Sequence, residues 1–266
     1  MNLLEEIDKI RQEGYSEANA QARLCQDILL YGISKGNLSK NVTIKGGIVL
    51  RNLSKNSRRA TQDIDLDFIK YSISDASIEN FIHNLCLIDG IQIILKKPIQ
   101  ELKHKDYKGK RIFVEIIDSD GNLLESKIDI GVHNDLDIKQ ESYCFDLCFQ
   151  DEGVNLLMNS KEQIITEKLK SFLRFSTRST RYKDVFDIYY LSQYADRNNL
   201  KRCIQKYIFD DNTLPIKDMQ EMTRRIKIVF QDSEFKNAIN HSQKNWTDST
   251  TEEVLHKNIE FISSLE

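Results

Sequence analysis

The sequence has little of several features on which common protein classes depend. Its 266 residues include only two prolines, and no apolar run is long enough to span a membrane. The N-terminal segment lacks the basic start and long apolar core of a signal peptide, so none is expected. The five cysteines are odd in number and form no Cys-x-x-Cys pair. These absences favour a cytoplasmic protein with reduced, buried thiols and no membrane partner.

Signatures of several catalytic classes are also missing. The sequence has no Gly-x-Ser-x-Gly, Cys/His or Walker A pattern, and its five histidines show no metal-ligand spacing. Cys144 and Cys148 have a spacing that favours one face of a helix over a zinc knuckle. The net charge of −3 argues against wholesale electrostatic binding of nucleic acid, although a local basic surface stays open. Any chemistry must therefore come from other residues.

A glycine pair, Gly46-Gly47, stands between two predicted elements. The pattern predicts a short strand over residues 41–45 and the start of a helix over residues 48–53. Glycine lets the backbone approach a ligand closely, and the first amides of a helix are free to bind an anion. The pair therefore predicts a phosphate-binding turn.

Three aspartates alternate with apolar residues in predicted strands. Asp63 and Asp65 are two residues apart in a strand predicted over 63–69, so both would point to one face. Asp129 lies in a strand predicted over 127–132 and joins the pair if the two strands are neighbours. Like charges this close repel unless a cation lies between them, and carboxylate oxygens suit Mg2+. The alternative is a solvated edge strand, because an isolated Asp-x-Asp is common by chance.

The predicted elements change in kind along the chain. Helices are predicted near 3–10 and 18–31, and strands and helices then alternate until strand-like runs stop near residue 155. Only helices follow, the first over 161–175. The sequence therefore predicts an α+β domain over residues 1–155 and a helical C-terminal domain over residues 156–266.

Four motifs in order resemble the AbiEii/AbiGii toxin family. Its members are nucleotidyltransferases of the DNA polymerase β-like superfamily, found in bacterial toxin–antitoxin and phage-defence systems. The first motif comprises Lys45-Gly46-Gly47 and Arg59-Ala60-Thr61-Gln62-Asp63-Ile64-Asp65-Leu66. The strand with the family's third carboxylate is similar to residues 127–130, its helical Glu-Lys-Leu motif to residues 165–169, and its Arg-x-Lys-Asp segment to residues 181–189.

The resemblance implies a polymerase β-like domain with a mixed sheet, packed against the helical domain, with the site in the cleft between them. It implies metal-dependent transfer of a nucleoside monophosphate from an NTP to an RNA acceptor, the 3′ end of a tRNA, and a cognate antitoxin as partner. The metal is Mg2+, with Mn2+ as an alternative, held by Asp63, Asp65 and Asp129. The catalytic residues implied are Asp63, Asp65, Asp129 and Lys168, and the nucleotide-binding residues are Gly46, Gly47, Arg59, Thr61, Lys168 and Asp184.

One departure from the family pattern keeps alternatives open. Superfamily members usually carry Ser or Thr directly after the second glycine, where this chain has Ile48. The backbone amides survive that change, so nucleotide binding would be weakened and not lost. One alternative is a transferase that modifies a protein or a small molecule. The other is a catalytically inactive RNA-binding or interaction module of the same fold.

Other charged residues could either stabilise the fold or bind RNA. Asp187 is expected to brace its helix, through Arg181 or Lys183. Basic residues also gather over residues 96–111, predicted as a loop and a strand start, and over residues 168–183. Either stretch could hold an RNA backbone, although a run of charge is more often a solvated face.

Overall fold

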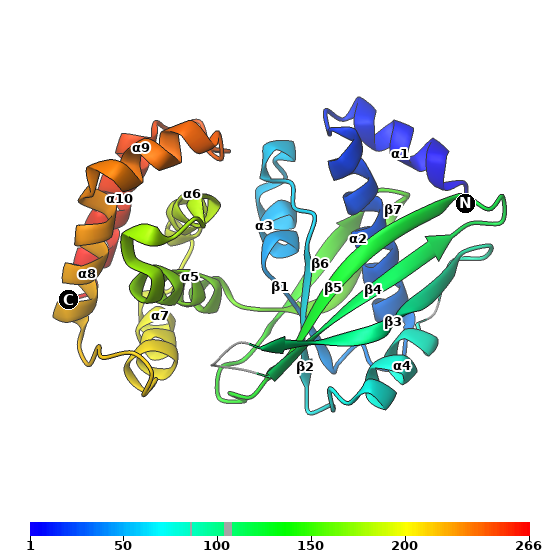
Figure 1. The fold of residues 1–266 in the computed structure, drawn as a ribbon, viewed down its shortest axis with the longest axis horizontal. Coiled ribbons are helices and arrows are strands. Elements are labelled where there is room, and N and C mark those ends of the chain that lie inside the picture. The colour runs from blue at the N-terminus through cyan, green and yellow to red at the C-terminus, as the bar shows by residue number, and fades with distance from the viewer. Residues whose placement is uncertain (86, 104–107) are drawn as a thin grey trace. The chain divides into compact units, whose positions relative to one another are not determined.

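The computed structural model describes residues 1–85, 87–103 and 108–266 and divides into two compact units (Figure 1). We call Met1–Asn159 the sheet unit and Ser160–Glu266 the helical unit. The helical unit begins later than residue 156 because the last strand of the sheet runs to Met158. None of the helices in the described part of the chain is long and apolar enough to cross a membrane.

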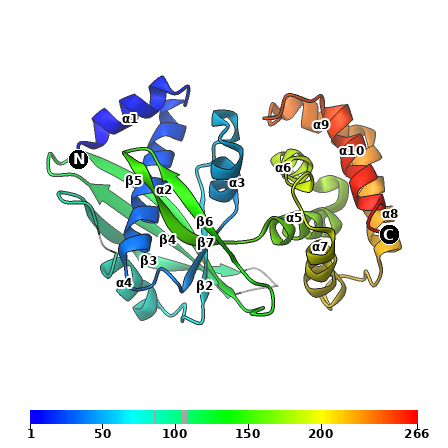
Figure 2. The same cartoon turned by 180° about the vertical axis from the view of Figure 1, so that it is seen from behind.

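A seven-stranded mixed sheet forms the centre of the sheet unit, with strand order β3-β4-β5-β2-β1-β7-β6 (Figure 2). The pairs β2–β5 and β1–β7 are parallel, and the other four pairs are antiparallel. This architecture confirms the predicted α+β class with a mixed sheet. The strands are β1 Val42–Lys45, β2 Ile64–Ile69, β3 Gln92–Lys103, β4 Lys108–Ile117, β5 Leu123–His133, β6 Glu141–Leu147 and β7 Gln150–Met158.

Helices of the sheet unit pack on the sheet and on one another. The helix α2 contacts β5, β6 and β7, α1 contacts α2, and α4 contacts β3. Apolar residues at helical spacing, among them Leu3, Ile7 and Ile10 of α1, are buried with Ile116 and Leu124 of the sheet. The bounds are α1 Leu3–Gln12, α2 Glu17–Lys35, α3 Gly47–Ser54, a 3-10 turn at Ser57–Arg59, and α4 Asp75–His83.

The region before the helical unit differs from the sequence-based prediction. Cys144 lies in the strand β6, and Cys148 in the turn before β7, so the predicted helical face for these two residues is wrong. The two strands form an antiparallel edge of the sheet. Among the other cysteines, Cys25 and Cys203 are buried free thiols, while Cys86 lies outside the described residues.

The helical unit is built around aromatic packing between its helices. Phe172 of α5 contacts Phe230 and Phe235 edge to face, and all three are fully buried. Ser160 caps α5 by accepting a hydrogen bond from the amide of Gln163, which starts the helix at the predicted place. The elements are α5 Lys161–Phe175, a 3-10 turn at Ser176–Arg178, α6 Tyr182–Ser192, α7 Arg197–Ile204, a π-helical turn at Gln205–Phe209, α8 Met219–Gln231, α9 Ser233–Ser242 and α10 Thr251–Ser263.

Candidate active site

The predicted glycine turn lies directly against the predicted carboxylate strand. Gly46 has φ of +66°, and a Cβ added there would stand 2.4 Å from Oδ2 of Asp65. A Cβ added to Gly47 would stand 2.4 Å from Oγ1 of Thr61. Both approaches are possible only without a side chain at these positions. The structure therefore brings Gly46, Gly47, Thr61 and Asp65 into one contact.

The strand register places Asp65 beside the third predicted carboxylate. Asp65 is paired with Lys45 of β1 on one side and with Asp129 of β5 on the other. Neighbouring strands are about 4.8 Å apart, so Asp65 and Asp129 are close neighbours on one face. Burial raises the pKa of Asp65 to about 6; Lys45 opposes this shift, while Asp129, Asp63 and Asp67 add to it. The fold thus disfavours the charged form of Asp65.

The other acids of this cluster each have a basic partner. Asp63 precedes the first residue of β2 and is exposed, and its Oδ1 lies 2.6 Å from Nζ of Lys127. Asp129 accepts two hydrogen bonds from Arg111, at 2.7 Å from Nε and 2.8 Å from Nη2. This is the bidentate geometry of a strong arginine–carboxylate pair. Both acids are therefore neutralised by neighbouring side chains.

Two of the participating residues were missed by the sequence reasoning. Asp67 continues the alternation of Asp63 and Asp65, is buried, and lies 2.8 Å from Nζ of Lys45. That alternation was a signal that could have identified it. Arg111 lies opposite Asp129 in the β4–β5 ladder, and this position follows only from the register.

The carboxylates fit a hard cation in chemistry but are not assembled as a closed metal site. Within the described residues, no group of three or more His, Cys, Asp or Glu side chains is arranged to hold a metal ion. The oxygen donors are nevertheless of the preferred type, and their mutual repulsion at Asp65 calls for positive charge. A divalent cation here would take the place of Lys127 at Asp63 and of Arg111 at Asp129.

Two predicted positions near the turn face the interior. Ile48 is 1% exposed, so its side chain packs in the core and leaves only backbone amides at the start of α3. Arg59 is 4% exposed, at the end of the 3-10 turn that precedes β2. A role for Arg59 at a phosphate group stays a prediction.

In the helical unit, the predicted lysine lies between two carboxylates. Nζ of Lys168 is 2.5 Å from Oδ1 of Asp184 and 2.9 Å from Oδ2 of Asp187. Asp187 is fully buried, and its Oδ1 accepts a hydrogen bond of 3.0 Å from the indole nitrogen of Trp246. Asp187 thus ties α6 to α5 and to the segment before α10, with Lys168 and Trp246 as its partners.

The two basic stretches differ in how their charge is compensated. The first belongs to the strands β3 and β4, where the sequence predicted a loop and a strand start. Its described ion pairs join Lys96, Lys97, Lys110 and Arg111 to acids, while His104 and Lys105 lie outside the described residues. In the second stretch, Lys170 and Arg174 pair with Asp211.

Arg178 and Arg181 are the exception in the second stretch. Both are exposed, and neither forms an ion pair with a described residue. They flank the segment that enters α6, and the carbonyl of Arg181 accepts a hydrogen bond from the amide of Asp184. Arg181 is three residues before Asp184 and Arg178 is six residues before it, so both leave positive charge at the surface ahead of α6.

Comparison with known proteins adds a family match across both units. The family model described as nucleotidyl transferase AbiEii toxin, type IV toxin–antitoxin system, matches residues 28–256. No curated protein sequence matches the chain. Among solved structures, the chain is similar to an antigenic nucleotidyltransferase-like protein from Paracoccidioides brasiliensis, with 14% identity and a TM-score of 0.41. That match covers 80% of this chain and 97% of the other.

Proposed function

Because the chain belongs to the AbiEii family of nucleotidyl transferase toxins, we propose that it transfers a nucleoside monophosphate from an NTP to the 3′ end of a tRNA. The family is that of a type IV toxin–antitoxin system, and the chain is a nucleotidyltransferase. We further propose that the acceptor is tRNA and that the reaction needs a divalent metal. The remaining proposals are a cytoplasmic location, a role in phage defence and a cognate antitoxin as partner.

The close approach of the glycine turn to Asp65 is the observation that carries this proposal. The turn offers backbone amides at the start of α3, and Asp65 lies beneath it with Asp129 on the next strand. An NTP bound there would have its phosphates at the amides and its α-phosphorus beside the carboxylates. Thr61, which packs under Gly47, would fix the turn.

The proposed metal site consists of Asp63, Asp65 and Asp129. When bound, Mg2+ or Mn2+ would neutralise charge on the triphosphate and increase the acidity of the acceptor hydroxyl. Asp129 accepts the proton of the 3′-hydroxyl after Arg111 has released it. The hydroxyl oxygen then forms a bond to the α-phosphorus, and the bond from that phosphorus to the bridging oxygen breaks, which releases pyrophosphate.

Residues of the helical unit complete the proposal. The ammonium of Lys168 would steady the leaving pyrophosphate, which requires that it leave Asp184. Asp187 and Trp246 keep α5 and α6 together while this happens. The uncompensated Arg178 and Arg181 would contact phosphates of the acceptor RNA.

Transfer of label from each α-labelled NTP to total tRNA, total protein and small molecules tests this function. We expect label on tRNA, and a fall of roughly 10²–10³-fold or more in Asp63→Ala and Asp65→Ala, because both remove charge at the reacting phosphate. Asp151→Ala, at an exposed aspartate of β7, is the matched control and should keep full activity.

The possible outcomes separate the alternatives. Undiminished transfer in Asp65→Ala would contradict the assignment of the site. Label on protein or small molecules, and none on tRNA, would contradict the acceptor but keep the transferase. If calorimetric titration detects no binding of any Mg-NTP, the chain is an inactive module of this fold.

A further inference from the structure

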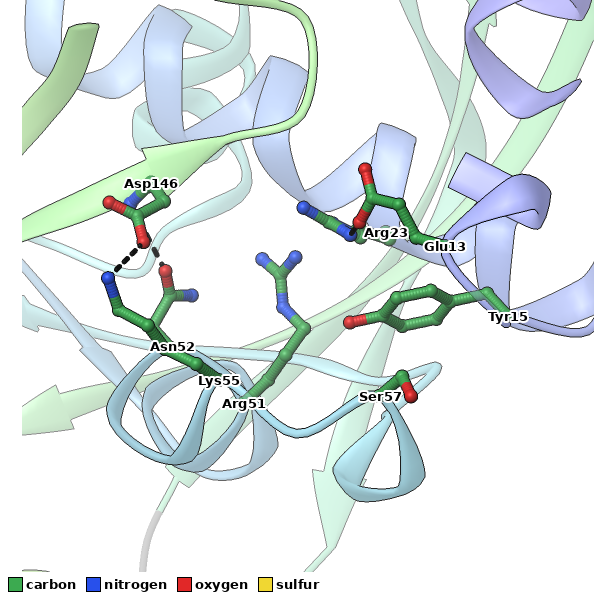
Figure 3. Close-up of a pocket in the computed structure, with 8 residues that line it drawn as sticks. All are labelled: Glu13, Tyr15, Arg23, Arg51, Asn52, Lys55, Ser57 and Asp146. Carbon is green, nitrogen blue, oxygen red and sulfur yellow. Dashed lines mark hydrogen bonds and ion pairs between the residues drawn. The ribbon is translucent and has the colours of Figure 1, made fainter. Parts of the chain in front are cut away.

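The sheet unit contains a polar cavity at the C-terminal end of α3, away from the glycine turn. Its volume is about 310 Å³. Arg51 is four residues beyond Gly47, about 6 Å along the helix axis. The short helix α3 therefore has the glycine turn at its start and the cavity near its end. The lining residues are Glu13, Tyr15, Arg23, Arg51, Asn52, Lys55, Ser57 and Asp146, drawn in Figure 3.

The two arginines of the cavity have far more hydrogen-bond donors than partners. A guanidinium carries five N–H donors. Arg51 is 5% exposed and donates one side-chain hydrogen bond, of 2.6 Å from Nη2 to Oδ1 of Asp27. Arg23 donates one side-chain hydrogen bond, to Glu13, and its Nε forms a longer ion pair of 3.7 Å with Oδ2 of the buried Asp27. The Nε atoms of both arginines are buried and have no hydrogen-bond partner. Such unpaired buried donors are costly unless an acceptor completes them.

Three carboxylates lie near these basic side chains. The pair of Lys55 with Asp146 is exposed on both sides, so it contributes little and can be exchanged for a ligand at small cost. Glu13 is half exposed and pairs with the partly buried Arg23, and Asp27 is fully buried and pairs with both arginines. Lys55 has φ of +50° because it is the left-handed residue at which α3 ends.

We propose that this cavity binds a phosphate group, as a second anion site of the sheet unit. Arg23 comes from α2, Arg51 from α3 and Ser57 from the 3-10 turn, and Figure 3 shows these side chains and the Tyr15 hydroxyl around one space. Donors on several sides suit the tetrahedral oxygens of phosphate better than the two coplanar oxygens of a carboxylate.

The size of the cavity indicates that the phosphate belongs to a larger molecule. A volume of about 310 Å³ lies in the range of small-molecule sites and exceeds what inorganic phosphate fills. The group would come from a free mononucleotide or from an RNA backbone. The site goes beyond the proposed transfer reaction, since it does not include the carboxylates of β2 and β5.

NMR of the arginine Nε–H groups tests the site in the full-length protein without NTP. Sodium phosphate is added at constant ionic strength, maintained with sodium chloride. We expect saturable shifts of the Arg23 and Arg51 signals, assigned from Arg23→Gln and Arg51→Lys. Arg23→Gln should weaken phosphate binding roughly tenfold, because it removes charged donors. Arg11→Gln is the control, since Arg11 forms only surface pairs, with Asp8 and Glu17, and lies outside the cavity.

Further variants and two competing ligands guard against misfolding and identify the source of the phosphate. Arg51 variants leave Asp27 buried with less compensation, so Tyr15→Phe and Arg23→Gln provide the test if Arg51→Lys fails to fold. Tighter competition by AMP than by an RNA oligomer without a terminal phosphate identifies a free nucleotide, and the reverse identifies RNA. Absence of saturable shifts, or equal phosphate binding by the wild type and Arg23→Gln, would overturn the proposal. Neither result depends on whether the protein transfers nucleotides.

Discussion

The sheet unit and the helical unit each place acids around basic side chains, but by different means. In the sheet unit, the ladder fixes the positions, so Asp65 stands between Lys45 and Asp129 whatever their charges. In the helical unit, Lys168 lies between Asp184 and a fully buried Asp187. In the first cluster, burial raises the pKa of Asp65 and the neighbouring acids add to this shift, whereas in the second a single ammonium is shared by two carboxylates.

This difference suggests that the two clusters have different roles, one in activity and the other also in stability. A carboxyl group whose pKa is raised by burial and by neighbouring acids is characteristic of functional sites. In the helical cluster Asp187 is fully buried, so removal of the lysine next to it would leave a buried charge with less compensation, which is strongly destabilising. We therefore expect substitutions in the sheet cluster to affect activity most, and substitutions in the helical cluster to affect stability as well.

The largest effect on stability is expected from Lys168→Met. This change removes the ammonium that lies 2.9 Å from the buried Asp187 and should lower the free energy of unfolding by roughly 3–5 kcal/mol. Urea denaturation followed by fluorescence of Trp246, the single tryptophan, reports on this cluster directly. Lys201→Met, at an exposed position of α7, is the control. If the free energy of unfolding falls by less than about 1 kcal/mol while transfer is lost, Lys168 contacts the phosphate and does not stabilise the fold.

A pair of glycine substitutions separates close approach from backbone strain. Gly46 and Gly121 both have positive φ, but an added Cβ meets Asp65 at Gly46 and has nothing within 4 Å at Gly121. Gly121→Ala should cost about 1–2 kcal/mol, and Gly46→Ala about 1–3 kcal/mol more because Asp65 must move. Thermal denaturation by circular dichroism measures both. Equal costs would contradict the tight contact between the turn and Asp65.

Removal of the buried charge of Asp65 should stabilise the sheet unit while it abolishes transfer. The pKa of Asp65 is raised to about 6 from an ordinary value of 3.8, so its contribution to stability is lost as the pH rises from about 4 to about 6. At pH 7, Asp65→Asn should raise the free energy of unfolding by about 1–2 kcal/mol, and by less near pH 4. Urea denaturation at both pH values measures this. The same difference at both pH values would contradict the raised pKa of Asp65.

The smallest effect is expected from the exposed arginines of the helical unit. Arg178→Gln and Arg181→Gln should each reduce the slope of log affinity for tRNA against log salt by about 1. Lys201→Met again serves as the control on the same unit. Unchanged slopes would mean that acceptor RNA is held elsewhere.

Local signals allowed much of the fold to be predicted from the sequence. The glycine pair identified the turn between β1 and α3, and apolar periodicity identified α5 with the bounds that the structure has. Both features depend on residues close in the chain. The strands β6 and β7 were missed, and β6 alternates only partly, with Cys144 and Asp146 exposed at the edge of the sheet.

The partners of the site acids could not be predicted in the same way. Asp63 was expected inside the strand and lies just before it, where it meets Lys127. Arg111 reaches Asp129 because β4 pairs with β5 in one particular register. A shift of that register by one residue would send Arg111 to the opposite face. Such contacts depend on how strands distant in the sequence pair, and the pattern of residues within one strand does not indicate this.

The two parallel strand pairs also determine when the proposed active site can form during synthesis. Parallel neighbours cannot be joined by a tight turn, so Asp65 meets Asp129 only after β5 has been made, and β1 gains its second neighbour only with β7. Pairings between such distant segments form slowly compared with local ones. A nascent chain that ends before residue 150 lacks β7 and cannot complete the sheet around its glycine turn. A potentially toxic activity would thus be withheld until the whole sheet unit has left the ribosome.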